Sequence, residues 1–322
     1  MKLQRIESGI WIGGETASGK SAVALALAEE IGGEVVSVDS MQVYRGLDVG
    51  TAKPGVEERG RIRHHLLDVV GLEQEFNVAD FCSGARSCIQ DILSRGAIPV
   101  LCGGTGLYFK ALLGGIGSAP ESDRQMRREL EATPLPSLVE ELREKDPETY
   151  QRIDLKNPRR VYRAVEILRM TGTGAVRHRS SWDQADVNLP PFFALRREPE
   201  DLKQRIRQRV DRMFAAGLVE ETRRLLGEGL EGNRVAMQAI GYRQVVEHLR
   251  GERDLESTMD SVKKRTWQFA RRQRNWFDRQ LPAQRVDVRR DEPVSETLQR
   301  ILQRIRETDV SHGYEERMTS PI

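Results

Sequence analysis

Short apolar runs alternate with helical segments in the first 115 residues of the chain. Ile10 to Ile12, Val35 to Val38 and Ile98 to Leu101 are β-type runs, and glycine or polar residues follow each of them. Between the first two runs, Ser21 to Ile31 is rich in alanine and leucine and is followed by Gly32-Gly33, which is typical of a helix C-terminus. This alternation predicts an α/β fold with a parallel sheet.

The pattern changes between about Pro120 and Pro191, where charged helical segments follow one another without a clear strand. Phe192 to Leu195 then forms a candidate strand that returns to the sheet, and long helices follow at 202–226 and 258–280. Leu202, Ile206, Val210 and Phe214 recur at every fourth position as a core-facing stripe. We therefore expect an α/β core with C-terminal helices (residues 1–118 and 192–308), a helical insertion (119–191) and a disordered tail (309–322).

Composition narrows the class of protein. The chain is 38% hydrophobic and 31% charged, as in soluble globular proteins. It has no apolar run near the roughly 20 residues of a membrane-spanning helix and no signal-peptide core, so we expect a cytoplasmic protein. Cys82, Cys88 and Cys102 fit neither a disulfide framework nor a zinc site. Residues 155–280 carry 27 Lys and Arg against 17 Asp and Glu, so a polyanionic partner would bind there.

A phosphate-binding motif lies between the first strand and the first helix. Gly14 to Ser21 fits G-x-x-x-x-G-K-[ST], and its position between a strand and a helix is the context that this motif requires. Backbone N–H groups would surround phosphate oxygens, Lys20 would add a positive charge and Ser21 would ligate Mg²⁺. The motif predicts a P-loop NTPase-like core, with phosphate contacts at Gly14, Thr16, Ala17, Ser18, Gly19, Lys20 and Ser21.

The predicted strands differ in the residues that come directly after them. Ile98 to Leu101 leads into Cys102-Gly103-Gly104-Thr105 and offers no carboxylate, unlike the strand that holds Mg²⁺ in many hydrolases. Val35 to Val38 delivers Asp39 to the carboxyl edge of the sheet, where ligands bind in such folds. Asp39 is therefore available for acid–base chemistry, or it simply caps a turn before Ser40.

A basic, aromatic segment lies near the C-terminal end of the predicted core. Lys263 to Arg279 holds seven Lys and Arg against one acid, with Trp267, Phe269, Trp276 and Phe277 between them. Such a face binds RNA phosphates and unstacked bases, but the aromatic residues also fit core anchors below a solvated basic face. A second basic set, Arg159, Arg160, Arg163 and Arg169, favours an RNA partner.

The chain resembles the tRNA dimethylallyltransferases, also called tRNA isopentenyltransferases, in motifs that run in order from Gly14 to about Phe277. These motifs are G-x-T-A-S-G-K-S at 14–21, D-S-M-Q-V-Y-R-G at 39–46, G-T-A-K-P at 50–54, H-H-L at 64–66, V-A-D-F at 78–81, G-G-T-G-L-Y at 103–108, A-I-G-Y-R-Q at 239–244 and A-R-R-Q at 270–273 with Trp276-Phe277.

The resemblance implies a reaction in which the dimethylallyl group of dimethylallyl diphosphate moves to N6 of the adenosine that is 3′-adjacent to a tRNA anticodon. The P-loop would then hold the diphosphate of the prenyl donor rather than ATP. Asp39 would accept the N6 proton. Thr105, Arg209, Lys20, and Ser21 with Mg²⁺ would stabilise the departing diphosphate.

The resemblance also implies contacts to tRNA. The insertion would hold the anticodon stem-loop, and we expect the chain to act as a monomer. The implied contact residues are Asp39, Ser40, Met41, Gln42, Arg127, Arg159, Arg160, Arg163, Gly241, Tyr242, Arg243, Arg271, Arg272, Gln273 and Arg274.

The chain departs from the family pattern at three positions. Glu15 stands where proline is usual and brings a carboxylate into the phosphate loop, which would weaken diphosphate binding unless the side chain points away. Trp267 replaces a usual arginine, and Gly106 replaces a usual larger residue. None of these changes removes an expected catalytic group.

Three other functions remain open on the sequence alone. A P-loop kinase of a small molecule would bind ATP and leave the basic helix unexplained. An adenylate dimethylallyltransferase would prenylate free AMP and would not need the helical insertion. A non-catalytic RNA-binding protein would not need Lys20, Ser21, Asp39 and Thr105 together.

Overall fold

The computed structural model describes residues 9–115, 117–178 and 189–319, and these form two compact units. The first unit is Met1–Lys110 with Asn188–Ile322, and the second is Ala111–Val187. The expected insertion, residues 119–191, lies within a few residues of the second unit at both ends. Each unit has a hydrophobic core of its own.

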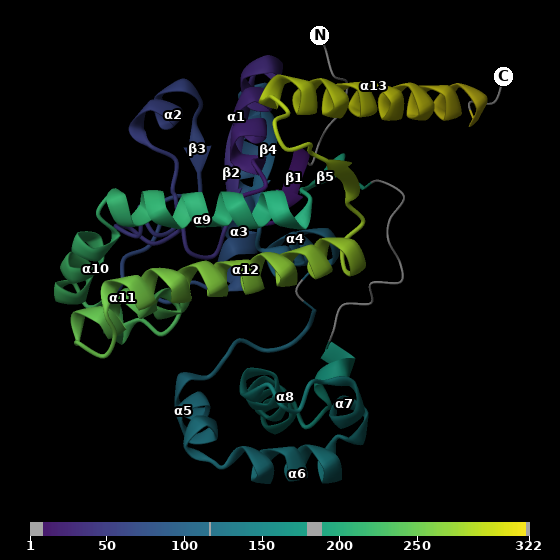
Figure 1. The fold of residues 1–322 in the computed structure, drawn as a ribbon. Helices are drawn as coiled ribbons and strands as arrows, with labels where there is room; N and C mark the ends of the chain where they lie inside the picture. Colours follow the sequence, from purple (N-terminus) through teal and green to yellow (C-terminus); the bar gives the residue numbers. More distant parts are fainter. Residues whose placement is uncertain (1–8, 116, 179–188, 320–322) are drawn as a thin grey trace. The chain divides into compact units, whose positions relative to one another are not determined.

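The first unit is built on a parallel sheet of six strands in the order β3-β2-β4-β1-β5-β6 (Figure 1). The expected parallel α/β fold is therefore confirmed. β5 follows the insertion and pairs with β1, so two strands that are distant in sequence lie side by side in the sheet. The strands are β1 (Ile10–Gly14), β2 (Gly33–Val38), β3 (His64–His65), β4 (Ile98–Gly103), β5 (Phe192–Arg196) and β6 (Gln284–Asp287).

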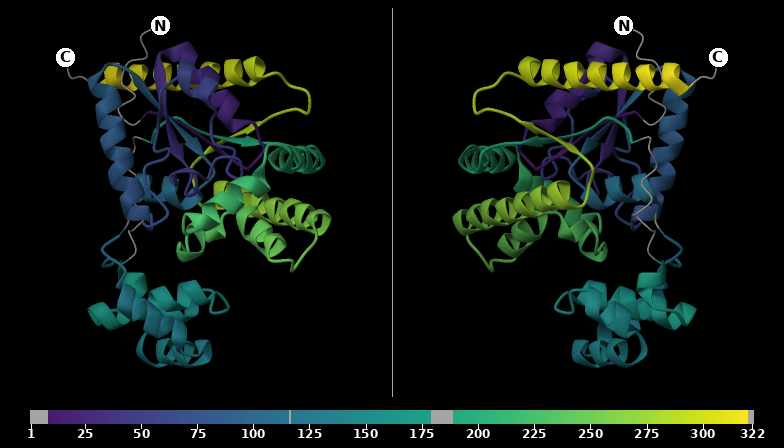
Figure 2. Two further views of the ribbon diagram at one scale, coloured as in Figure 1. Left: turned by 90° about the vertical axis from the view of Figure 1, so that its left-hand side faces the viewer. Right: turned by 90° about the vertical axis from the view of Figure 1, so that its right-hand side faces the viewer.

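The two faces of the sheet have different cores. On one face, α1 (Lys20–Ile31) and α13 (Val294–Thr319) cover an aliphatic cluster that includes Ile12, Leu27 and Ile301. On the other face, the aromatic rings of Trp11, Phe109, Phe192 and Phe277 contact one another at centroid distances of 4.8–6.2 Å. α3 (Val78–Ser94), α4 (Gly106–Gly114) and α12 (Leu255–Arg279) supply the cover there (Figure 2).

A helical layer lies against the carboxyl edge of the sheet. α9 (Pro199–Ala215) and α12 run side by side (Figure 1), and Leu202, Ile206 and Val210 are buried between them with Val262 and Ala270. The predicted stripe is confirmed, with Phe214 partly buried at its end. The remaining elements of this unit are α2 (Val56–Arg61), α10 (Leu218–Gly227), η2 (Leu230–Gly232), η3 (Ala236–Gln238) and α11 (Tyr242–Leu249).

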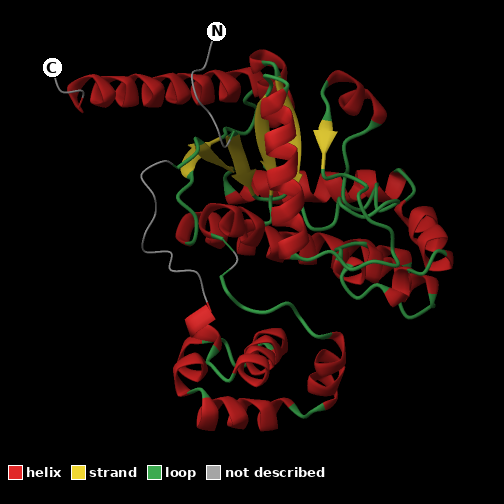
Figure 3. Cartoon of the chain, turned by 180° about the vertical axis from the view of Figure 1, so that it is seen from behind, coloured by secondary structure: helices red, strands yellow, loops and turns green. Residues whose placement is uncertain are grey.

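The second unit is helical throughout its described residues (Figure 3). Leu138, Leu142, Val161 and Val165 are fully buried and form the centre of a core that is separate from those of the first unit. Asp123, Asp146 and Asn157 begin three of its helices, because a side-chain oxygen satisfies an unpaired N–H group in the first turn. Its elements are α5 (Arg124–Ala132), α6 (Leu135–Lys145), α7 (Pro147–Arg152), α8 (Pro158–Thr171) and η1 (Ala175–His178).

The C-terminal segment differs from the expected disordered tail. α13 continues to Thr319, so residues 309–319 are helical, and residues 320–322 lie outside the described part of the chain. The physical reason is that Leu298, Ile301 and Ile305 anchor the first half of α13 in the aliphatic core. Once such a nucleus exists, each further helical residue adds a hydrogen bond without another nucleation cost.

Candidate active site

The phosphate loop has the backbone shape that its glycines predict. Gly14 has φ 145° and Gly19 has φ 97°, values that favour glycine, and Ala17 also lies in the left-handed region at φ 64°. A Cβ on Gly14 would lie 2.7 Å from the Leu195 carbonyl oxygen on β5. The loop therefore turns tightly between β1 and α1. The buried Ser18 hydroxyl has no hydrogen-bond partner among the described residues.

Lys20 begins α1 and lies beside the acidic and thiol groups of the neighbouring strands. Its Nζ donates a hydrogen bond to the Glu15 carbonyl oxygen at 3.1 Å. Desolvation lowers the pKa of this ammonium, whereas nearby Cys102 and Asp39 act to raise it. Burial raises the pKa of the Cys102 thiol to about 11, so this cysteine stays neutral, as a small core residue would.

Asp39 and Thr105 follow adjacent strands and meet at the carboxyl edge of the sheet. The Asp39 Oδ1 accepts hydrogen bonds from the backbone N–H groups of Met41 at 2.8 Å and Gln42 at 3.4 Å. The Thr105 Oγ1 accepts one from the Ser40 N–H at 3.2 Å. Asp39 therefore caps the turn that follows it, which is one of the two roles expected from the sequence. Its carboxylate is also close enough to Lys20 and Arg209 to interact with both charges.

Arg209 reaches this group from α9. Its Nη2 donates a hydrogen bond to the Thr51 carbonyl oxygen at 3.1 Å, and desolvation lowers its pKa while Asp39 acts to raise it. The Arg209 side chain is thus directed toward the site. Lys20, Asp39, Thr105 and Arg209 therefore come together, although they lie in four separate parts of the chain.

A cavity of about 590 Å³ opens beside the phosphate loop. Its walls are the start of α1, the loop before α2, and one side of α9. Cationic side chains dominate its polar lining, which suits an anion that bears more than one negative charge. The cationic lining residues are Lys20, Lys53, Arg205, Arg209 and Arg212, and Ser21 also lines it.

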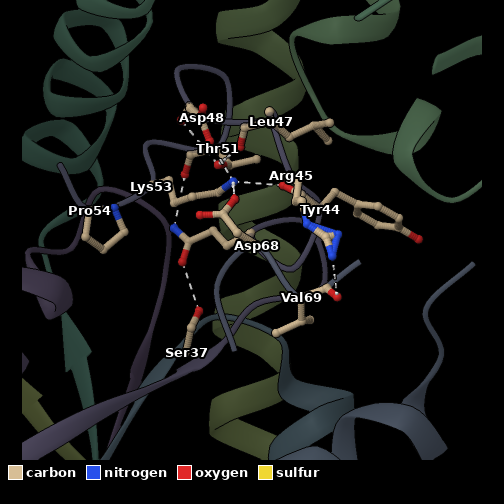
Figure 4. Close-up of polar contacts among 12 residues, drawn as sticks. Ser37, Tyr44, Arg45, Leu47, Asp48, Thr51, Lys53, Pro54, Asp68 and Val69 are labelled. Atoms are coloured by element: carbon tan, nitrogen blue, oxygen red, sulfur yellow. Dashed lines mark hydrogen bonds and ion pairs between the residues drawn. The ribbon is translucent and has the colours of Figure 1, made fainter. Parts of the chain in front are cut away.

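Lys53 holds together the loop that carries Asp39 (Figure 4). Its side chain is 1% exposed, and its Nζ donates to Asp48 Oδ1 at 2.6 Å, Asp68 Oδ1 at 2.6 Å and the Tyr44 carbonyl oxygen at 2.8 Å. Gln42 lies in the same loop, where its Oε1 accepts a hydrogen bond from Ser37 Oγ at 2.9 Å. This network fixes the backbone around Thr51, to which Arg209 is bonded.

Gly241 and Tyr242, which we expect to contact tRNA, are both buried in this structure, and their contact with tRNA stays a prediction. The Tyr242 hydroxyl donates to Glu221 Oε1 at 2.6 Å and accepts from the Gly50 N–H at 3.1 Å, and burial raises its pKa. Glu221 also accepts from the Val49 N–H at 2.9 Å. Tyr242 and Glu221 thus bind the backbone of the loop that follows Asp39, whereas the neighbouring Arg243 is exposed.

One face of α12 is buried and another carries exposed arginines. Thr258, Val262, Thr266, Ala270, Gln273 and Phe277 are buried, and Arg271 and Arg272 are exposed. Gln273 is buried, and its expected contact with tRNA stays a prediction. Trp267 packs against the α9–α12 core, while Phe269 is 37% exposed.

Glu15 points away from the phosphate side of its loop. Its side chain is fully buried, and its carboxylate accepts hydrogen bonds from Arg196 at 2.9 Å and from Arg274 at 2.9 and 3.0 Å. Arg196 also binds Asp278. The carboxylate charge is thus neutralised inside the protein. Arg274, expected to contact tRNA, is instead engaged in this pair.

A comparable pair lies within the second unit. Glu166 is fully buried, and its Oε2 binds Arg127 at 3.0 Å and Arg163 at 2.7 Å. Its Oε1 accepts a hydrogen bond from Ser122 Oγ at 2.6 Å. The two arginines expected to contact tRNA are thus 25% and 32% exposed and tied to this carboxylate, whereas Arg159 and Arg160 lie on the surface.

The described part of the chain contains no group of three or more His, Cys, Asp or Glu side chains that could hold a metal ion. None of the described helices is long and apolar enough to cross a membrane.

Comparisons with known proteins place these features in context. A family model described as IPP transferase matches residues 42–280. A tRNA dimethylallyltransferase from Geobacter metallireducens is 45% identical over 274 residues, which cover 83% of this chain and 88% of that protein. One from Chlamydia pneumoniae is 40% identical over 281 residues, covering 84% of this chain and 82% of that protein.

Solved structures agree with the sequence comparisons. A full-length tRNA isopentenylpyrophosphate transferase from Bacillus halodurans superposes with a TM-score of 0.67 at 35% identity, covering 94% of this chain and 98% of that one. A eukaryotic dimethylallyltransferase described as acting on tRNA gives a TM-score of 0.73 at 30% identity, covering 87% of this chain and 73% of that one.

Proposed function

The chain belongs to the tRNA dimethylallyltransferase family, and we propose that it transfers the dimethylallyl group of dimethylallyl diphosphate to N6 of the adenosine 3′-adjacent to the anticodon, releasing diphosphate. The observation that carries this proposal is the convergence of Lys20, Asp39, Thr105 and Arg209 at one edge of the sheet. The partner is the anticodon stem-loop of tRNA, and the chain acts as a monomer.

Bond formation requires a free adenine amine close to the donor. A base that is flipped out of the loop can bring N6 to C1 of the donor. As the new C1–N6 bond forms, the bond between C1 and the diphosphate oxygen breaks, and the electron pair leaves with the diphosphate. Asp39 takes the proton that N6 loses, because its carboxylate is held by the turn at the mouth of the site.

The leaving group determines the rest of the site. Diphosphate gains negative charge as it departs, and Lys20, Arg209 and the loop amides lie where they can stabilise that charge. The Thr105 hydroxyl is at the same edge and can donate to a bridging oxygen. The cavity beside the loop, with its five cationic residues, fits the diphosphate better than a neutral substrate.

Mg²⁺ fits the donor set at this site. Ser21 is exposed at the start of α1 and lines the cavity, so its hydroxyl oxygen is open to a hard cation. The ion would take its other ligands from diphosphate oxygens and water. When bound, Mg²⁺ neutralises part of the charge on the diphosphate.

The direct test is incubation of the protein with Mg²⁺, labelled dimethylallyl diphosphate and unmodified tRNA, with AMP and ATP in parallel, followed by nucleoside analysis. We expect label only in N6-substituted adenosine from tRNA. Label in AMP would instead identify an adenylate dimethylallyltransferase. ATP turnover without prenyl transfer would identify a kinase.

The role of Asp39 has its own test. We expect Asp39→Ala to lower turnover by about 10²–10⁴-fold, the usual contribution of a positioned general base, with little change in tRNA affinity. Single-turnover transfer and a tRNA binding titration measure the two quantities separately. Near-normal turnover would remove Asp39 from the mechanism.

A further inference from the structure

α12 approaches the phosphate loop through a polar side chain. Gln273 continues the buried stripe of this helix and is 6% exposed. Its Oε1 accepts a hydrogen bond from the Thr16 N–H at 2.8 Å, and its Nε2 donates to the Gly104 carbonyl oxygen at 3.0 Å. One amide therefore joins the phosphate loop to the loop that carries Thr105.

This hydrogen bond also changes the role expected of Thr16. Its backbone N–H points to Gln273, so it is not available to a phosphate oxygen in this geometry. The amide instead helps to set the curvature of the loop. Farther along the loop, the N–H groups of Gly19 and Lys20 at the start of α1 can then face the diphosphate.

Glycines allow α12 to come this close. A Cβ on Gly13 would lie 2.2 Å from Phe277 Cε1, one on Gly104 would lie 2.1 Å from Gln273 Nε2, and one on Gly106 would lie 3.1 Å from Trp276 Cβ. None of the three has a positive φ, so glycine is needed here for space rather than for backbone conformation. The small residue at position 106, unusual for the family, fits beneath Trp276.

Arg274 adds a second connection between α12 and the loop. Its Nε and Nη2 bind the two carboxylate oxygens of Glu15, and Nη2 also donates to the Arg197 carbonyl oxygen at 2.8 Å. The pair draws Glu15 toward α12 and keeps its charge away from the diphosphate side. Gln273 and Arg274 thus act on successive residues of the loop, Thr16 and Glu15.

We propose that Gln273 and Arg274 are positioning residues for the prenyl donor: they hold the phosphate loop and the Thr105 loop in the shape that binds diphosphate. They do so from the helix whose outward face carries the exposed Arg271 and Arg272. Donor binding and the RNA-facing surface therefore share one helix. The identification of the bound diphosphate as a prenyl donor rests on the proposed function, whereas the role of these two residues in diphosphate binding does not.

The first experiment measures diphosphate affinity without catalysis. Gln273→Met keeps the length of the side chain and removes both hydrogen bonds. We expect it to raise two quantities by about tenfold, the dissociation constant for magnesium diphosphate and the KM for dimethylallyl diphosphate. Such a change corresponds to the loss of about one hydrogen bond. Affinity for tRNA should stay within about twofold of wild type. Arg272→Ala is the matched control on the same helix, with weaker tRNA binding and unchanged diphosphate affinity.

A second variant tests the same contact from the other loop. In Gly104→Ala the added methyl group displaces the Gln273 amide, so diphosphate binding should weaken as in Gln273→Met. In a Gln273→Ala background the space is free, and Gly104→Ala should then cost no further affinity, a non-additive result that a general loss of structure would not produce.

The outcomes separate this proposal from the proposed function. If Gln273→Met and Gly104→Ala leave diphosphate affinity within twofold of wild type, the positioning role is wrong, and weakened tRNA binding by Gln273→Met would make Gln273 a tRNA contact. If the wild-type protein transfers no prenyl group to tRNA, the proposed function fails, but the diphosphate titrations still decide the role of Gln273.

Discussion

Two fully buried glutamates, one in each unit, bind a pair of arginines, but they organise the chain on different scales. Glu166 binds Arg163 on its own helix and Arg127 on nearby α5, so both partners belong to the helical unit. Glu15 binds Arg196 on β5 and Arg274 on α12, which lie 181 and 259 residues away. The carboxylate of Glu166 therefore stabilises the packing of two neighbouring helices. The carboxylate of Glu15 instead joins the phosphate loop to a strand and a helix that are distant in sequence.

The largest effect should come from breaking the long-range pair. Glu15→Ala leaves Arg196, which is 4% exposed, with the half-exposed Asp278 as its remaining carboxylate partner. Removing one partner of a buried pair typically costs about 3–5 kcal/mol in the free energy of unfolding. We also expect the KM for the donor to rise, since Arg274 loses its partner in the loop. Urea unfolding and steady-state kinetics measure the two effects.

Glu15→Gln is the matched control, because it keeps the shape and a hydrogen-bond acceptor and should cost less than Glu15→Ala. Equal stability of Glu15→Ala and wild type would contradict the importance of the pair.

Glu166→Ala should have a smaller and purely local effect. Arg127 and Arg163 are partly exposed and can turn to water once the carboxylate is gone, so we expect a loss of about 1–3 kcal/mol. Hydrogen exchange should become faster in residues 111–187, while the KM for dimethylallyl diphosphate stays unchanged. A large increase in that KM would show that the two glutamates are not independent.

Tyr242→Phe should have the smallest effect of the three. It removes one hydroxyl from the network of Glu221 and Gly50, but Glu221 keeps the N–H of Val49. We expect a loss of about 1–2 kcal/mol in the free energy of unfolding. Thermal unfolding measures it. If Tyr242→Phe lowers the free energy of tRNA binding by more than the free energy of unfolding, the result would support the expected RNA contact at this position.

The fold could be predicted because its signals are local. The runs at β1, β2, β4 and β5 and the glycine-rich loop between β1 and α1 each show in a few consecutive residues, and the parallel sheet follows from their alternation. The end of α13 could not be predicted, because the polar residues after Ile305 carry no periodic pattern. Their helicity follows from the packed turns before them.

Some residues of the candidate site could likewise be predicted from local sequence, and others could not. Lys20 and Ser21 begin the helix after the phosphate loop, Asp39 and Thr105 follow strands, and the resemblance to a family adds Arg209. The sequence did not indicate which arginines face inward. Arg127, Arg163 and Arg274 look alike as surface cations until Glu166 and Glu15 are placed beside them. Glu166 is only three residues from Arg163, but its burial is a tertiary property, and for Arg127 and Arg274 the carboxylate partner is distant in sequence. Burial of Tyr242 and Gln273 is likewise a tertiary property.

The pairing of β1 with β5 has a consequence for the order in which the chain folds. During synthesis the helical unit, residues 111–187, emerges before Phe192–Arg196, and its own core allows it to fold while β1, already able to pair with β4, still lacks β5. The phosphate loop is translated early, yet it acquires Arg196 only after β5 has been made, and Gln273 and Arg274 only when α12 has left the ribosome. A nascent chain therefore carries an unfinished phosphate loop for most of its synthesis, and donor binding begins only when the protein is nearly complete.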